Sequence, residues 1–345
     1  MTELGCKASV FDPALYMYYK EDGSLGGMIL THVDDLLHGS GDDQFQQTVM
    51  EPLKKRFLFG REEDSEFKYV GVRVQQNIDE ITTDQDQYVE ELLVPDLKDF
   101  EKVDEVDSLL DDEGQAEFRT VVGRLGWVAS TSRPDLSYDS LVLSTKLGDA
   151  TVRDMKQAIK IIKKVKCGFT SMKFVNLGAI DEWSLEAYGD AGFKSLPDKT
   201  SSCAGYVTLL CNKNKNVACV LNWKSKKLRR VVSSSTAAEA LSANEALDDM
   251  VYLKLVLMEM LGGEAEKIPM ILVTDSKNLH KAVLSSTAVE NPRMRTDLVK
   301  LKESLKEKEL QEFKHVLRKD MIADVLTKKG APGVKLMKIL RTCSA

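Results

Sequence analysis

The chain has 345 residues, of which 43% are hydrophobic and 30% are charged, and its formal net charge is −6. This length and composition predict two or three globular domains. No apolar run approaches the roughly 20 residues that a transmembrane helix needs. No apolar stretch follows residues 1–5 either, so we expect neither a membrane span nor secretion.

The cysteines and histidines argue against a zinc site. Six cysteines occur without CxxC spacing, and the chain has only four histidines. We therefore expect reduced thiols and an intracellular protein, in the cytoplasm or the nucleus.

The charge is divided unevenly along the chain. Residues 1–183 carry 21 basic and 35 acidic side chains, whereas residues 184–345 carry 27 basic and 19 acidic ones. A basic half that also contains carboxylates in apolar surroundings suits a polyanionic substrate held around a metal site.

The first half of the chain predicts strands followed by helices. An apolar run over residues 27–37 is interrupted by Asp34 and Asp35, which predicts a β-hairpin with this pair at its tip. A helix is expected over residues 43–57, a strand over 67–74, a short strand over 81–83 and a short helix over 85–93. Residues 98–117 are acidic and poor in large apolar side chains, which predicts an exposed linker. Helices are expected over 117–130, 136–146 and 150–166.

The second half alternates between strands and helices. Strands are expected over residues 185–190, 204–211 and 217–223, then a long helix over 236–261 that ends at two glycines. A buried type of strand over 270–274 and a helix over 276–284 follow. A charged helix over 293–308, a strand over 311–317 and a closing helix over 320–328 complete the pattern, which predicts a mixed sheet with helices on its faces.

Four acidic residues stand at the ends of apolar runs or early in helices of this second half. They are Asp190, Glu239, Asp275 and Asp324, in the segments YGDA, SSSTAAEA, LVTDS and IADVLTK. Such an arrangement can bring carboxylates from distant positions into one divalent-metal site. Taken singly, each of the three aspartates is more typical of an ordinary surface acid at a strand or helix end, and the four acids together favour the metal site. For Glu239, a capping box with Thr236 is the alternative, because the spacing Thr-x-x-Glu fits one.

Seven segments in order resemble a known family. They are THVDDLL, EFKYVGVRV, FRTVVGRLGWVASTSRPDLSYD, YGDAGF, WKSKKLRRVVSSSTAAEAL, ILVTDSKNLHKAV and FKHVLRKDMIADVLTKKG. Together they resemble the C-terminal part of a copia-type retrotransposon Pol polyprotein, which is the end of a reverse transcriptase followed by a ribonuclease H domain. The resemblance implies a mixed α/β fold with a ribonuclease H-like sheet flanked by helices, preceded by a partial palm and a helical thumb or connection.

The resemblance divides the chain and assigns its acids. It implies a partial palm at 1–97, an acidic linker at 98–117, a helical thumb or connection at 118–180, a ribonuclease H-like domain at 184–330 and a tail at 331–345. The metal-binding and catalytic residues it implies are Asp190, Glu239, Asp275 and Asp324. These would hold two Mg²⁺ ions, for which Mn²⁺ is an alternative.

The same resemblance matches Asp34 and Asp35 to the paired aspartates of a polymerase palm. His32 stands where the family often has an aromatic residue. The polymerase's other metal-binding aspartate lies upstream of the pair, and no acidic residue among positions 1–30 stands in a comparable strand context. We therefore expect the polymerase site to be a remnant.

Two further features have both a functional and a structural interpretation. The cations of residues 223–230 are either contacts to substrate phosphates or a solvated loop. These cations, called the basic segment below, are Lys224, Lys226, Lys227, Arg229 and Arg230. His315 lies nine residues before Asp324, where it is a candidate for proton transfer, although alternation with Phe313 favours a structural role.

The leading hypothesis is a metal-dependent endonuclease that cleaves the RNA strand of RNA·DNA hybrids. A nucleic-acid-binding relic without catalysis is the first alternative. An active RNA-directed DNA polymerase is the second, and the missing upstream aspartate argues against it. The sequence does not indicate an oligomeric state.

Overall fold

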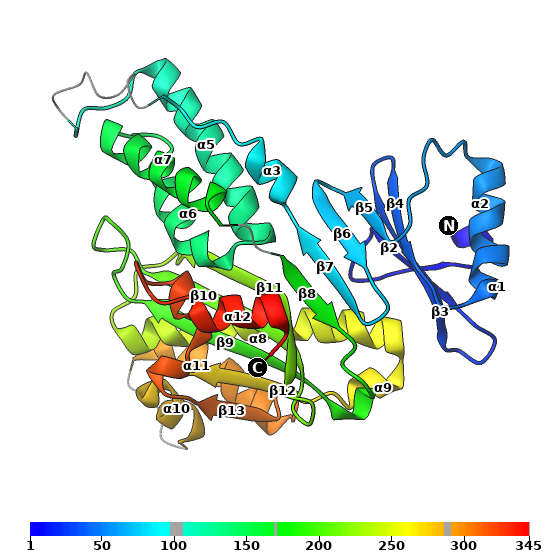
Figure 1. The fold of residues 1–345 in the computed structure, drawn as a ribbon. Coiled ribbons are helices and arrows are strands. Elements are labelled where there is room, and N and C mark those ends of the chain that lie inside the picture. The colour runs from blue at the N-terminus through cyan, green and yellow to red at the C-terminus, as the bar shows by residue number, and fades with distance from the viewer. Residues whose placement is uncertain (97–105, 169–170, 286–290, 345) are drawn as a thin grey trace.

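Three β-sheets and several groups of helices follow one another in the computed structural model, which describes residues 1–96, 106–168, 171–285 and 291–344 (Figure 1). The two smaller sheets lie toward the N-terminal end, and the five-stranded sheet lies in the C-terminal half. Among the described helices, none combines the length and the apolar character that crossing a membrane requires.

The first sheet contains the expected hairpin. Its antiparallel strands, in spatial order, are β1 (Lys7–Ala8), β2 (Leu15–Tyr19), β3 (Leu25–His32) and β4 (Asp35–Gly39). His32 pairs with Asp35, so that Val33 and Asp34 form a two-residue turn. Val33 has a φ of 52°, which a turn of this kind needs and a β-branched residue rarely adopts.

A continuous helical segment packs on this sheet, as predicted for residues 43–57. It comprises α1 (Asp43–Phe45), a π-helical turn (Gln46–Met50) and α2 (Glu51–Arg56). The ring of Phe45 is fully buried against Gly27, where an added Cβ atom would lie only 2.4 Å from a ring carbon. This close approach requires glycine at position 27.

The second sheet corrects the expected strand over residues 67–74. Its antiparallel strands are β5 (Glu66–Tyr69), β6 (Val72–Gln76), β7 (Glu80–Asp84) and β8 (Met172–Val175). The expected single strand is a hairpin, because Val70 and Gly71 both have positive φ and reverse the chain. β8, which the sequence analysis did not expect, lies within the predicted thumb or connection at 118–180 and pairs with β7, with Val175 opposite Glu80.

A group of helices connects β7 to β8 along the chain. Its helices are α3 (Asp86–Glu90), α5 (Asp112–Thr131), α6 (Ser137–Ser144) and α7 (Val152–Lys166). α5 begins five residues before the expected start, because the Asp111 carboxylate accepts a hydrogen bond from the Gly114 amide and caps the helix. Residues 98–105 of the predicted acidic linker lie outside the described residues.

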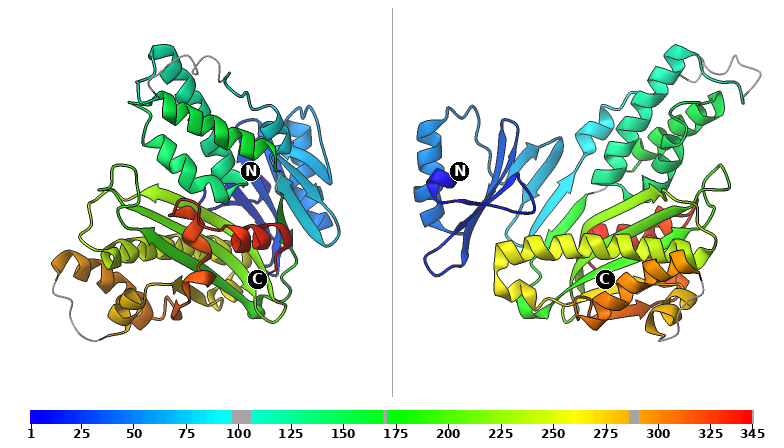
Figure 2. Two further views of the ribbon diagram at one scale, coloured as in Figure 1. Left: turned by 60° about the vertical axis from the view of Figure 1, so that its left-hand side comes forward. Right: turned by 180° about the vertical axis from the view of Figure 1, so that it is seen from behind.

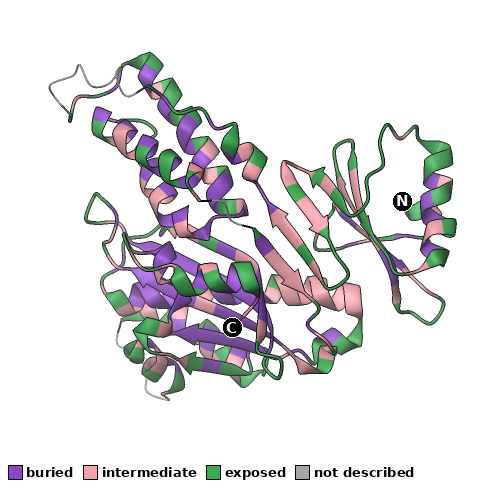
Figure 3. Ribbon diagram, in the orientation of Figure 1, coloured by how far each residue is buried: buried purple, intermediate pink, exposed green. Residues whose placement is uncertain are grey.

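The C-terminal sheet has five strands in the spatial order β11-β10-β9-β12-β13. The strands are β9 (Trp183–Gly192), β10 (Cys203–Asn212), β11 (Val217–Lys227), β12 (Met270–Thr274) and β13 (Glu312–His315). β10 pairs antiparallel with β9 and β11, whereas β12 pairs parallel with β9 and β13. The predicted meander and the later parallel strands therefore join into one mixed sheet, whose interior residues are largely buried (Figure 3).

Helices cover both faces of this sheet (Figure 2). One face packs against α8 (Ser235–Leu261), α10 (Lys277–Leu284) and α11 (Pro292–Lys306), and α9 (Gly263–Glu266) follows α8. The other face packs against the short 3₁₀ helix Ile322–Leu326 and α12 (Val334–Thr342), and an exposed 3₁₀ helix (Arg318–Asp320) precedes them. The predicted mixed α/β class is confirmed. The 3₁₀ helices replace the closing helix expected over 320–328.

The segment expected to be a tail, residues 331–345, contains helix α12. Leu336 and Leu340 of this helix are each only 1% exposed, because they pack against the sheet. The segment therefore contributes to the core of the C-terminal half.

Candidate metal centre

The register of two neighbouring strands brings Asp190 and Asp275 to the same position at the edge of the sheet. β9 and β12 are parallel, and Tyr188 pairs with Val273. Asp190 and Asp275 each lie two residues further along the chain, so both side chains point to the same face of the sheet. Asp190 is fully buried.

Asp324 joins this pair from the 3₁₀ helix Ile322–Leu326, which packs across the end of β9. One ligand oxygen from each of Asp190, Asp275 and Asp324 lies within 4.8 Å of the other two. Carboxylate oxygens at this separation match the ligand set of a magnesium site. Three of the four predicted acids therefore meet directly.

Glu239 enters from one turn inside α8, on the face that packs against β9. Ser234 precedes the helix and caps it, because its hydroxyl accepts a hydrogen bond from the Ala237 amide. The capping box of Glu239 with Thr236 is therefore wrong, because the cap lies two residues earlier.

One oxygen of the buried Glu239 carboxyl is unsatisfied, because its Oε2 atom has no hydrogen-bond partner. Burial, followed by the charges of Asp190 and Asp275, raises the pKa of Glu239 to about 9, although Lys328 and a hydrogen bond with the backbone of Ala191 favour its charged form. A buried carboxyl oxygen that lacks a partner, in a group that faces other carboxylates, is an arrangement that a bound cation would satisfy, so the residues present fit a divalent metal.

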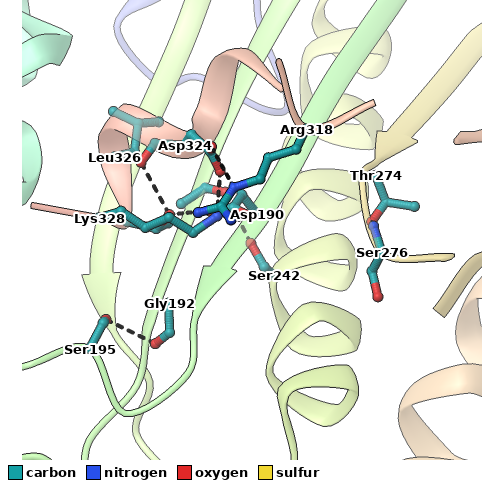
Figure 4. A network of polar contacts seen from close by, with 12 residues as sticks. Asp190, Gly192, Ser195, Ser242, Thr274, Ser276, Arg318, Asp324, Leu326 and Lys328 are labelled. Atoms are coloured by element: carbon teal, nitrogen blue, oxygen red, sulfur yellow. Dashed lines mark hydrogen bonds and ion pairs between the residues drawn. The ribbon is translucent and has the colours of Figure 1, made fainter. Parts of the chain in front are cut away.

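The sequence analysis missed the cationic and hydroxyl neighbours of this cluster (Figure 4). Lys328 Nζ donates to Asp190 Oδ1 at 3.0 Å and also to Asp324 Oδ1. The Thr327 hydroxyl donates to the other oxygen of Asp190. Arg318 Nε lies 3.7 Å from Asp324 Oδ2. The one signal in the sequence is the spacing of four residues between Asp324 and Lys328, which is typical of an ion pair on a helix.

The contacts with Lys328 and Thr327 partly offset the effect that burial has on the charge of the Asp190 carboxyl. Burial raises the pKa of the Asp190 carboxyl above its ordinary value, although Lys328 and Thr327 favour its charged form. The cluster therefore concentrates negative charge that its own side chains compensate only in part.

His315 ends β13 beside the cluster. Its Nε2 atom lies 3.2 Å from the backbone carbonyl oxygen of Asp275, and its ring centroid lies 5.9 Å from that of His280. This contact holds the His315 ring next to the backbone of Asp275, and its Nε2 atom is directed at a backbone carbonyl oxygen and not at a carboxylate. Both interpretations of His315 therefore stay open.

The basic segment lies at the end of β11 and just beyond it. β11 extends to Lys227, four residues further than predicted. Three of its five cations form ion pairs within the chain: Lys226 with Glu245, Lys227 with Asp198 at 3.3 Å, and Arg230 with Asp297. Lys224 and Arg229 are exposed.

A groove of about 480 Å³ lies beside the end of the basic segment. Arg230, Ser233, Asn291 and Arg293 contribute polar side chains to its lining. Asn291 caps the N-terminus of α11 by accepting from the amides of Arg293 and Met294. The two arginines lie beside a helix N-terminus, and Asp297, which pairs with Arg230, also lines the groove, so Arg293 supplies the charge that Asp297 does not neutralise.

Asp34 and Asp35 are exposed at the tip of the β3–β4 hairpin. Within the described part of the chain, the group of at least three potential metal-ligating side chains consists of Asp190, Asp275 and Asp324, so this pair belongs to no such group. The structure does not bring the polymerase-like pair together with a third carboxylate among these residues.

In the C-terminal half, a five-stranded mixed sheet with helices on both faces has acids at the ends of its adjacent parallel strands, which is the ribonuclease H-like arrangement expected from the sequence. No family model matches the chain. The chain is homologous to transposon Pol polyproteins: it is 26% identical, over 94% of its length, to the retrovirus-related Pol polyprotein from transposon RE1 of Arabidopsis thaliana. A transposon Ty5-1 protein of Saccharomyces cerevisiae is 30% identical over 131 residues, which are 38% of this chain and 40% of that protein. The resemblance seen in the sequence is confirmed.

The chain spans about a fifth of the length of the RE1 polyprotein, 22% of it. Among solved structures, it is similar to the LC11 ribonuclease H1 isolated from compost, with a TM-score of 0.31 and 18% identity over 42% of this chain and 92% of that one. It is also similar to a foamy viral protease-reverse transcriptase in complex with an RNA/DNA hybrid, with a TM-score of 0.43 and 11% identity over 85% of this chain and 36% of that one.

Proposed function

We propose that the chain is a metal-dependent endonuclease that cleaves the RNA strand of RNA·DNA hybrids, within a fragment of a retrotransposon Pol protein. The observation that carries this proposal is the meeting of Asp190, Asp275 and Asp324 within 4.8 Å, next to Glu239, whose Oε2 atom is buried without a hydrogen-bond partner. Lys328 offsets the charge of Asp190 and Asp324 only in part, and the negative charge that remains is what a divalent cation would balance.

Asp190, Glu239, Asp275 and Asp324 are the proposed ligands of two Mg²⁺ ions, with Mn²⁺ as the alternative. When bound, such ions supply a water molecule of lowered pKa and stabilise the charge on the departing 3′-oxygen. The products would carry 5′-phosphate and 3′-hydroxyl ends. The chain's contribution is rigid placement, because β9 and β12 hold two of the ligands in register and α8 holds a third.

We propose that the basic segment positions the hybrid through its phosphates. Lys224 near the end of β11 and Arg229 just beyond it are exposed. Arg230 lines the groove described above, together with Asn291 and Arg293. Contacts to phosphates orient a duplex without reading its sequence. Preference for a hybrid would come from groove shape and from contacts to the 2′-hydroxyls of the RNA strand.

The N-terminal half is proposed to be a partial reverse transcriptase palm at 1–97, whose Asp34 and Asp35 are remnants of a polymerase site. Residues 118–180 would be the thumb or connection and 184–330 the nuclease domain. The linker would end where α5 begins, at Asp112, and α12 of the segment expected to be a tail would belong with the nuclease domain on which it packs. An intracellular location also stays a prediction. His315 is a candidate for proton transfer at the nuclease site.

A cleavage assay separates this proposal from its alternatives. The purified chain is incubated with an end-labelled RNA·DNA hybrid, with Mg²⁺ or with a chelator, and with single-stranded RNA and duplex DNA as controls. We expect fragments of the RNA strand only from the hybrid and only with Mg²⁺. Binding of the hybrid without cleavage would favour the relic, and extension of a primer would favour the polymerase.

A further inference from the structure

Lys328 bridges two carboxylates of the acidic cluster. Its ammonium group contacts both Asp190, at 3.0 Å, and Asp324, and its side chain is only 27% exposed (Figure 4). Two carboxylates from segments more than 130 residues apart therefore share one cation that the chain itself provides.

This position has an electrostatic reason. Carboxylates that lie within 4.8 Å of one another repel strongly at low dielectric constant unless a cation lies among them. The Lys328 ammonium is directed at oxygens of two of the three clustered aspartates, whose carboxylates are also the proposed ligands of a divalent ion. An ammonium group and a metal ion cannot both occupy this space.

We propose that Lys328 is a built-in counter-cation, which stabilises the metal-free cluster and must be displaced when a divalent metal ion binds. This inference rests on the proposed metal centre and adds a means by which the chain regulates its own metal binding. Lys328 thereby sets the metal concentration at which the site begins to fill, because the ion that binds to Asp190 and Asp324 has to replace their contacts with Lys328.

The local structure allows this displacement. The preceding Thr327 is fully buried and bonded to Asp190, so it holds the backbone in place. The following residues, Lys329 and Gly330, are exposed. The four-carbon side chain of Lys328 can therefore turn towards solvent by rotation of its own bonds while the carboxylates keep their positions.

Metal affinity tests the proposal. Binding of Mn²⁺ is measured by calorimetry for the full chain, for Lys328→Ala and for Lys329→Ala, which removes the same charge from the exposed neighbour. We expect Lys328→Ala to bind Mn²⁺ roughly tenfold more tightly or better, since a unit charge at contact distance is removed. Lys329→Ala should bind as the unchanged chain does. Equal or weaker binding by Lys328→Ala would overturn the proposal.

A second measurement on the unchanged chain does not depend on the folding of a variant. An amine-acetylating reagent is applied with and without Mg²⁺, and modification of each lysine is quantified by mass spectrometry. Mg²⁺ should increase the labelling of Lys328 several-fold and leave that of Lys329 unchanged. If the chain binds metal but the labelling of Lys328 does not increase, the displacement of Lys328 is contradicted and the metal centre is not. Lack of Mn²⁺ binding by every protein would overturn the metal centre itself and the displacement with it.

Discussion

Trp223 Nε1 donates a hydrogen bond of 2.8 Å to the backbone carbonyl oxygen of Ala129. Trp223 lies on β11 of the five-stranded sheet and Ala129 near the end of α5, and both are buried. A second bond, from the Tyr138 hydroxyl of α6 to the carbonyl of Ser195 at 2.7 Å, joins the same two parts of the chain. The connecting helices and the nuclease-like sheet are therefore docked by specific polar contacts as well as by apolar packing.

Trp223→Phe should weaken this docking. The variant removes the indole N–H and leaves the Ala129 carbonyl without its donor, which costs about 1–3 kcal/mol. Urea unfolding followed by circular dichroism measures the loss. Trp127→Phe, at a side chain that is 37% exposed on the same helix, is the control and should change the free energy of unfolding little. Equal effects of both variants would contradict the specific role of Trp223.

The metal-free protein should lose stability as the pH rises. Glu239 has a folded pKa of about 9 instead of 4.5, so between these values the folded chain holds a proton that the unfolded chain has released. The free energy of unfolding therefore falls across this window, by at most about 1.4 kcal/mol per pH unit.

Denaturant titrations in a chelator between pH 5 and pH 9, set by these two pKa values, check this prediction. Glu239→Gln should remove most of the slope, because glutamine does not titrate. Added Mg²⁺ should stabilise the unchanged chain most at high pH, where the carboxyl is charged. A slope that persists in the variant would assign the effect to other groups.

Loss of the basic segment should weaken hybrid binding and flatten its salt dependence. The variant replaces four cations with alanine: Lys226, Lys227, Arg229 and Arg230. Each lost phosphate contact lowers the magnitude of the logarithmic salt slope by about 0.9, because fewer counterions are released. Fluorescence anisotropy over a salt series measures this slope, with Lys306→Ala combined with Lys308→Ala as the control. An unchanged salt slope would show that the basic segment does not contact phosphates and is a solvated surface whose cations pair within the chain.

Asp34→Asn combined with Asp35→Asn should leave hybrid cleavage unchanged. The pair is exposed on the β3–β4 turn and belongs to no group of three potential metal ligands among the described residues. The same cleavage assay, run beside a primer-extension assay, measures both activities. Primer extension by the unchanged chain that is lost in this variant would show that the palm is an active polymerase.

The sequence predicted the acids of the candidate site because their signal is local. Asp275 directly follows a run of apolar strand residues, so a position at the end of a buried strand could be recognised without knowledge of the fold. The parallel pairing that brings Asp190 beside it is a property of the assembled sheet.

Other features depend on partners that are distant in the chain. β8 has only four residues and becomes a strand by pairing with β7, about 90 positions earlier. Lys328 resembles an ordinary surface cation until Asp190, 138 residues away, lies next to it. The sequence analysis missed the hairpin of β5 and β6 for a local reason. Val70 adopts a positive φ that is rare for a β-branched residue, so its identity predicted a strand where the chain turns.

The most direct test of the central claim is Mg²⁺-dependent cleavage of a labelled RNA·DNA hybrid by the unchanged chain and by Asp275→Asn. The amide keeps the shape of the side chain and loses the charge that would hold a metal ion. We predict cleavage of the RNA strand by the unchanged chain, a loss of at least about a hundredfold in the variant, and nearly equal binding of the hybrid by both. Equal cleavage by the two proteins, or cleavage that persists in a chelator, would contradict a metal-dependent nuclease centred on Asp275.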